Sequence, residues 1–240
     1  MLKALFALLG AAKFGKLFLT GGSMLLSVFV YAFIFGWWYA VGFVLLIFVH
    51  EMGHYLAARR RKLNVGLPTF IPFVGAWIEL KQLPHDAETE AYVGIAGPFV
   101  GTLGALACYF VARYYDSNLL LALSYSGFFL NLFNLIPLSP FDGGRVTQVI
   151  SPRLWLLGVP ILVALFFYRP SPLLVLMALL AAPHVWRAIK HDPEDPQTAA
   201  YYNVPMETRV TYGAYYLLLV GYLAVMTHEV HEMLGALRAE

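Results

Sequence analysis

The sequence GWWYAVGFVLLIFVHEMGH at residues 36–54 closes an apolar run that begins at residue 22 and contains no charge before the final pentapeptide. Histidines four residues apart lie about 40° apart around a helix, so both imidazoles of that pentapeptide can reach one metal ion. The glutamate between them can take a proton from water at the metal. A carboxylate that enters hydrocarbon is costly unless it has a function. The stretch therefore predicts a membrane helix that ends in a metal site, and a zinc hydrolase site is the first hypothesis.

The composition is that of a membrane protein. Of 240 residues, 60% are hydrophobic and 12% are charged, and the mean hydropathy is +0.68, whereas soluble chains carry about 25% charged residues. The net charge of +2 is too small to indicate a nucleic-acid partner. Cys108 is the single cysteine, which excludes an internal disulfide and a cysteine-rich zinc site.

Seven apolar segments give the expected architecture, an all-α polytopic membrane protein with about six to seven transmembrane helices. Lysines at positions 3, 13 and 16 predict an interfacial amphipathic helix over residues 1–21, with a cleaved signal peptide as the competing interpretation. Residues 191–210 form a turn-rich linker rich in proline and acidic residues. The segments are 22–35, 37–59, 91–114, 119–138, 154–168, 173–189 and 211–227.

Residues 67–81 are apolar but do not look helical. Pro68 and Pro72 disfavour a helix, and the β-branched and aromatic residues predict two short strands joined by a bend around Gly75. Non-helical backbone enters a membrane only where protein or a wet cavity satisfies its polar groups. We therefore expect a small re-entrant β-hairpin beside the metal site. An interfacial loop is the alternative.

Basic residues are distributed unevenly across this map. With a cytosolic amino terminus, 13 of the 16 lysines and arginines fall at cytosolic ends, as the positive-inside rule requires. This places the amino terminus, the residue 50–54 motif and the residue 191–210 linker on the cytosolic side. An integral protein of the cell membrane is expected.

A catalytic zinc usually has three protein ligands and an open position for water. Asp142 ends the fourth apolar segment on the side that also carries His50 and His54, so two distant motifs reach the same face. A simple turn-former before Gly143 is the alternative reading of Asp142. The sequence around it is NLIPLSPFDGGR, residues 134–145.

Together the two motifs resemble the site-2 protease family of intramembrane zinc metalloproteases, in which HExxH is combined with N-x-x-P-x-x-x-x-D-G. The resemblance covers about residues 37–145 and implies a catalytic membrane core over 22–145, with peripheral transmembrane helices over 146–190 and a final helix and tail over 211–240. It implies one Zn²⁺ per chain. It also suggests a compact form, because no PDZ or CBS domain fits between the apolar segments.

The resemblance assigns roles to individual residues. His50, His54 and Asp142 would bind zinc, and Glu51 would act as the general base. Asn134 would support the substrate, although a packing amide or a role shared with Asn131 is equally open. Pro137 would break the helix and widen a wet cavity. The edge of the predicted hairpin could hold an unwound substrate by strand addition, a role proposed for Val74 and Ile78.

The predicted activity is hydrolysis of a peptide bond within or next to a transmembrane segment, with a single-span membrane protein as the partner in the lipid bilayer. An inactive zinc-binding adaptor is the alternative, but an adaptor needs no Glu51. A metal transporter predicts paired sites along a pore, and the sequence offers one. His228, Glu229, His231 and Glu232 are interpreted as a solvated helix end. Oligomeric state is left open.

Overall fold

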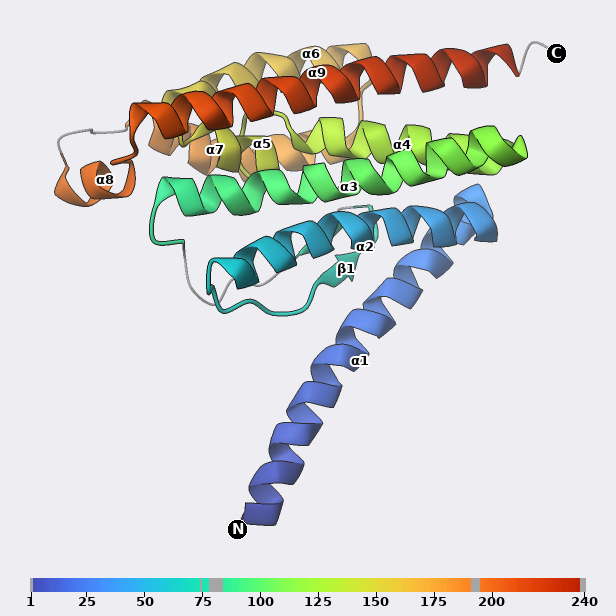
Figure 1. Cartoon of the computed structure of the whole chain (residues 1–240), viewed down its shortest axis with the longest axis horizontal. Helices are drawn as coiled ribbons and strands as arrows, with labels where there is room; N and C mark the ends of the chain where they lie inside the picture. The colour runs from blue at the N-terminus through green and yellow to red at the C-terminus, as the bar shows by residue number, and fades with distance from the viewer. Residues whose placement is uncertain (1, 74, 78–83, 191–194, 238–240) are drawn as a thin grey trace.

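The computed structural model describes residues 2–73, 75–77, 84–190 and 195–237, without the side chains of residues 2–18, 77 and 197. The chain is almost entirely helical, with one two-stranded hairpin, which confirms the predicted all-α class (Figure 1). Val74 and Ile78 lie outside the described residues. The elements are α1 Leu2–Phe35, α2 Trp37–Arg60, β1 Thr69–Ile71, β2 Gly75–Trp77, α3 Ala87–Tyr115, α4 Asn118–Asn134, α5 Asp142–Thr147, the 3₁₀ helix η1 Pro152–Leu157, α6 Gly158–Tyr168, α7 Pro172–Ile189, α8 Pro196–Tyr201 and α9 Met206–Ala236.

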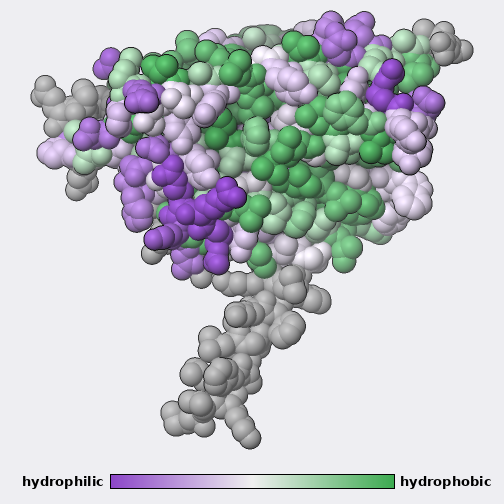
Figure 2. All heavy atoms as spheres, viewed as in Figure 1, coloured by the Kyte–Doolittle hydropathy of each residue, from purple (hydrophilic) through white to green (hydrophobic). Residues whose placement is uncertain are grey.

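Four helices in the described part of the chain are long and apolar enough to cross a membrane: α2, α3, α7 and α9. Two shorter apolar helical stretches, Leu19–Phe35 and Pro152–Tyr168, accompany them. Hydrophobic residues cover the middle of the face in Figure 2, and hydrophilic residues gather towards its two ends. This is the surface of an integral membrane protein. The count of six to seven crossings stays a prediction.

The core of the bundle is a row of antiparallel helices. α3 lies between α2 and α4, and α9 covers α4, whereas α1 leaves the bundle at an angle (Figure 1). The corner between α1 and α2 is Gly36, whose φ of +84° suits a residue without a Cβ. α2 and α3 approach to backbone contact, because a Cβ at Gly53 would collide with the carbonyl of Ala96.

Three segment boundaries in the structure differ from those expected from the sequence. α1 continues without a break across residue 21, where a separate interfacial helix was expected to end; its depth in the membrane stays a prediction. The linker contains α8, and α9 begins at Met206, before the predicted start at residue 211. The fourth segment was expected to be helical to about residue 138, but α4 ends at Asn134.

Proline explains the early end of α4. Pro137 and Pro140 have no N–H to donate and disfavour a helix interior, and the chain turns through residues 135–141. In this turn Leu138 N donates to Ile136 O, and Phe141 N donates to Leu138 O. Asp142 then begins a new helix, α5. Asn134 and Asp142 are therefore on separate elements, not two turns apart on one helix.

The hairpin forms as predicted, with a different turn. β1 and β2 are antiparallel, and Phe70 is opposite Ala76. The bend begins at Pro72 and Phe73, while Gly75 is the first residue of β2 with φ of +118°. Phe70 N donates to Ser23 Oγ at 3.0 Å, and Phe73 N donates to Tyr31 OH at 2.9 Å. The hairpin is thus fixed to α1, and the Phe70 ring stacks on Phe48 of α2.

Candidate metal centre

Three predicted ligands, brought by α2 and α5, meet in one place. Asp142 Oδ2 lies 3.1 Å from His50 Nε2 and 3.1 Å from His54 Nε2. The two Nε2 atoms are 3.1 Å from each other. All three residues are buried, with exposures of 3%, 6% and 8% for His50, His54 and Asp142. Two motifs separated by almost ninety residues therefore form one buried triangle of possible ligand atoms.

The Nδ1 atom of each histidine has a hydrogen-bond partner on a neighbouring helix. His54 Nδ1 lies 2.8 Å from the carbonyl oxygen of Val93, which can only accept a hydrogen bond. His50 Nδ1 lies 2.8 Å from Asn131 Oδ1, and the Asn131 amide nitrogen donates to Gly127 O. Both Nδ1 atoms therefore carry the proton, and both Nε2 lone pairs point at Asp142. Metal-binding histidines are held by partners of this kind.

This arrangement fits a zinc ion. If both imidazoles are neutral, their Nε2 lone pairs and the carboxylate oxygen face one another at 3.1 Å and repel unless a proton or a metal ion lies among them. Tetrahedral zinc with bonds of about 2.0–2.1 Å places neighbouring ligand atoms about 3.3 Å apart. In the described part of the chain this is the one group of His, Cys, Asp or Glu residues able to hold a metal. Three protein ligands also leave a fourth position for water.

Comparison with known proteins agrees with this geometry. Residues 38–117, which include both histidines, match the model of peptidase family M50. A zinc metalloprotease of Methanocaldococcus jannaschii is 32% identical over 123 residues, or 48% of this chain. Over this part of its length the chain is therefore similar to peptidase family M50, the site-2 protease family. A chain of Arabidopsis thaliana named "Probable zinc metalloprotease EGY1, chloroplastic" is 24% identical over 156 residues, or 45% of this chain.

The matches cover only part of these relatives. They span 35% of the length of the archaeal protein and 28% of the length of the plant protein. The M50 match ends at residue 117, before Asp142. The place of Asp142 in the metal centre therefore rests on the distances in this structure.

A row of glycines on one face of α3 makes room for the metal centre. A Cβ at Gly97 would collide with the His54 ring, and one at Gly101 would collide with the Asn131 amide. At Gly94 a Cβ would lie 2.9 Å from Arg145 Cβ. These glycines are three and four residues apart and so share one helix face. α3 contributes no ligand, yet its shape fixes where the site side chains lie.

The remaining predicted site residues have varied environments. Glu51 is buried, with 8% exposure, beside His50 in the chain. Asn134 is half-buried, and its amide nitrogen donates to Leu130 O at 3.0 Å. Pro137 lies in the turn before α5, where its carbonyl packs close to Gly158. The structure brings none of them into the ligand triangle, so their roles stay predictions.

Asn131, not Asn134, supports a histidine of the metal centre. Asn131 is 1% exposed and accepts the hydrogen bond from His50. The sequence motif points to Asn134 because the family pattern begins there. Asn131 lies one turn earlier on the same helix, but which amide faces His50 depends on how α4 is rotated against α3.

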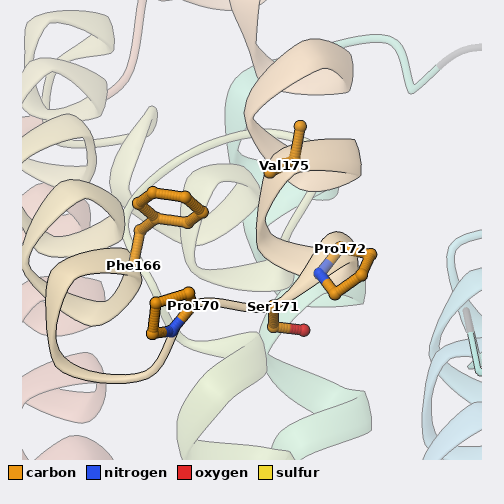
Figure 3. A pocket seen from close by; sticks show the side chains of 5 residues that line it. All are labelled: Phe166, Pro170, Ser171, Pro172 and Val175. Atoms are coloured by element: carbon orange, nitrogen blue, oxygen red, sulfur yellow. The ribbon is translucent and has the colours of Figure 1, made fainter.

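Two other features do not involve the residues of the metal centre. A shallow apolar hollow at the turn between α6 and α7 is lined by Phe166, Pro170, Ser171, Pro172 and Val175, none of them a predicted site residue (Figure 3). His228, Glu229, His231 and Glu232 lie exposed on α9. This fits the interpretation of that cluster as a solvated stretch of helix.

Proposed function

We propose that this chain is an intramembrane zinc endopeptidase that hydrolyses a peptide bond within or next to a transmembrane segment. The observation that carries the proposal is the buried triangle of His50, His54 and Asp142 inside a bundle of apolar helices. A membrane-spanning peptide, preferably of a single-span protein, is the substrate that can reach such a site from the bilayer. The names of the zinc metalloprotease relatives support the reaction class.

Glu51 is assigned the proton transfers. Zinc, when bound, polarises water and lowers its pKa to about 7. The Glu51 carboxylate accepts the proton of the attacking water and returns it to the leaving amine nitrogen. Its burial next to His50 in the chain keeps it away from bulk water. An adaptor that only binds clients would have no use for this group.

We assign the site to the cytosolic side of the cell membrane. Arg59, Arg60, Arg61 and Lys62 follow the metal-binding end of α2 directly. Arg61 is anchored there, because its Nη2 lies 2.9 Å from Glu88 Oε1 and its guanidinium covers the ring of Tyr92. Basic residues at this end support a cytosolic orientation.

The outer edge of β2 is the place we assign to the unwound substrate. Phe70 N points away from β2, since it donates to Ser23 on α1. Its partner in the antiparallel register is Ala76, so the Ala76 N–H also points out of the hairpin, on the other side. The outer edge of β1 faces α1, whereas the outer edge of β2 offers this donor to an added strand.

The general-base assignment is tested with Glu51→Gln in purified full-length chain in liposomes that contain a single-span reporter. We expect zinc to be retained and cleavage to be lost, and Glu229→Gln on exposed α9 to cleave normally. Cleavage by Glu51→Gln at the wild-type rate would refute the role. A wild-type chain that binds reporter and zinc but cleaves nothing would favour the adaptor. Zinc flux that falls with Asp142→Ala, without any cleavage, would favour a transporter.

The strand assignment is tested with Ala76→Pro, which removes the outward N–H but no hydrogen bond between β1 and β2. Cleavage should fall while zinc content stays constant. Ala76→Ser keeps the N–H and is the matched control. Equal turnover of the proline and serine variants would rule out substrate pairing at this edge. Val74→Pro and Ile78→Pro should act in the same way as Ala76→Pro if the added strand extends beyond β2.

A further inference from the structure

The two oxygens of Asp142 face different partners. Oδ2 belongs to the ligand triangle, and Oδ1 lies 3.7 Å from Arg145 Nη1. Arg145 is three residues later in α5, on the same side of the short helix. A carboxylate with one oxygen towards a cationic guanidinium and the other towards the histidines has a fixed rotation. That rotation presents a single oxygen to the metal position.

Arg145 is itself held from a second side. Its Nε lies 3.8 Å from Glu90 Oε1, and the other oxygen of Glu90 accepts a hydrogen bond from the Tyr201 hydroxyl. Burial, together with the Glu90 carboxylate, raises the pKa of Tyr201 well above its usual value, so the hydroxyl stays protonated and donates at neutral pH. Glu90 is on α3 and Tyr201 is on α8, which lies beside the start of α3 (Figure 1).

The surroundings of Arg145 leave little freedom. α3 approaches α5 so closely at Gly94 that a Cβ there would lie 2.9 Å from Arg145 Cβ. The Nη2 nitrogen is buried and has no hydrogen-bond partner among the described residues. A buried donor without a partner is costly, so packing stability alone does not account for a guanidinium here. Its charge separates two carboxylates, Glu90 and Asp142, that would otherwise repel each other.

We propose that Arg145 is a positioning residue that holds Oδ1 of Asp142 and thereby turns Oδ2 towards the two histidines. Glu90 and Tyr201 hold Arg145 in turn, so zinc affinity depends on a hydroxyl in the segment between α7 and α9. The inference rests on the proposed function only in taking the triad to hold zinc. It does not require that the chain cleaves a peptide.

The test is a zinc competition titration against a chelator on the purified full-length chain, paired with the visible spectrum of the Co²⁺-loaded chain. Arg145→Gln should weaken zinc binding about 10- to 100-fold, as loss of a group that orients a ligand does, and should change the Co²⁺ spectrum. Arg145→Lys should recover part of the affinity. Arg153→Gln, a matched change at an exposed arginine in η1, should leave both readouts unchanged.

Tyr201→Phe should also weaken zinc binding, by a smaller factor, and should have little further effect when Arg145 is already glutamine. Tyr168→Phe, at an exposed residue of α6, is its control. Wild-type zinc affinity and an unchanged Co²⁺ spectrum in both Arg145→Lys and Arg145→Gln would overturn the proposal. The same loss from Tyr201→Phe in both backgrounds would overturn the link through Arg145. A wild-type chain that binds zinc but cleaves no reporter would contradict the protease proposal but not the proposal about Arg145.

Discussion

Glycines recur along both α3 and α9, but what lies beside them differs. On α3, a Cβ at Gly97 or Gly101 would collide with the side chain of a site residue. On α9, a Cβ at Gly213 would come no closer than 3.4 Å to Ile150, and one at Gly221 would meet nothing within 4 Å. The helices around the metal centre are thus packed to near backbone contact, whereas α9 is attached through larger side chains. Substitutions that add atoms at these glycines should therefore be tolerated better on α9 than on α3.

The largest loss of zinc affinity is expected from a change at Asp142, the ligand that α5 contributes. Asp142→Asn removes the negative charge of a ligand and should lower zinc affinity by more than the roughly 100-fold reached when only an orienting group is lost. Asp116→Asn, at the exposed left-handed end of α3, is the control because asparagine suits that backbone. Zinc content after dialysis measures both. Equal zinc retention would remove Asp142 from the metal centre.

The comparison of the two helices is tested most directly by Gly97→Ala. The added methyl group has no space beside the His54 ring, and the strain should cost about 1–3 kcal/mol and displace a ligand. We expect zinc binding and cleavage to fall together, the former by about tenfold or more. Measurement of both on the same preparation is needed. Wild-type zinc affinity in Gly97→Ala would show that α3 can move away from α2 at little cost.

The two asparagines of α4 should differ in their effect on zinc affinity. Asn131→Ala removes the acceptor of the His50 hydrogen bond and should weaken zinc binding about 10- to 100-fold. Asn134→Ala should leave zinc affinity unchanged, and any loss of cleavage would then belong to the substrate. Zinc titration and reporter cleavage together separate the roles. Equal zinc affinities for the two variants would contradict the assignment of Asn131.

The smallest effect is expected on α9. Gly221→Ala adds a methyl group in open space and should stabilise the helix by about 0.5–1 kcal/mol through backbone entropy. Thermal unfolding followed by circular dichroism in detergent measures the shift. Zinc affinity and cleavage should match the wild type. Loss of either would show that α9 packs against the site more tightly than its glycines indicate.

The helical membrane class and the ligand triad could be predicted from the sequence because each has a local pattern. Apolar runs of about 20 residues are governed by bilayer thickness, and the spacing of His50 and His54 is governed by the helical repeat. To predict that Asp142 lies near the two histidines, the membrane crossings between the two motifs also had to be counted. That count put both on the same side, and the 3.1 Å distances agree with it.

The rest depends on packing, which a single sequence does not display. The end of α4 at Asn134 could be anticipated from Pro137, but which amide then faces His50 depends on how α4 is rotated against α3. The glycines of α3 carry no motif that shows what they accommodate, because the side chain beside each one comes from another helix. The contact of Tyr201 with Glu90 joins positions over a hundred residues apart, without any motif.

The attachment of the hairpin to α1 has a consequence for how a membrane peptide is admitted. Ser23 and Tyr31 are eight residues apart, about two turns, and each hydroxyl accepts a backbone N–H from the β1 side of the hairpin. The hairpin is therefore tied by its backbone to α1, the outermost helix, and by the Phe70 ring to α2, the helix that carries the histidines. If β2 receives the substrate as proposed, a sideways movement of α1 would also shift the strand that receives the peptide, and entry and capture would be coupled.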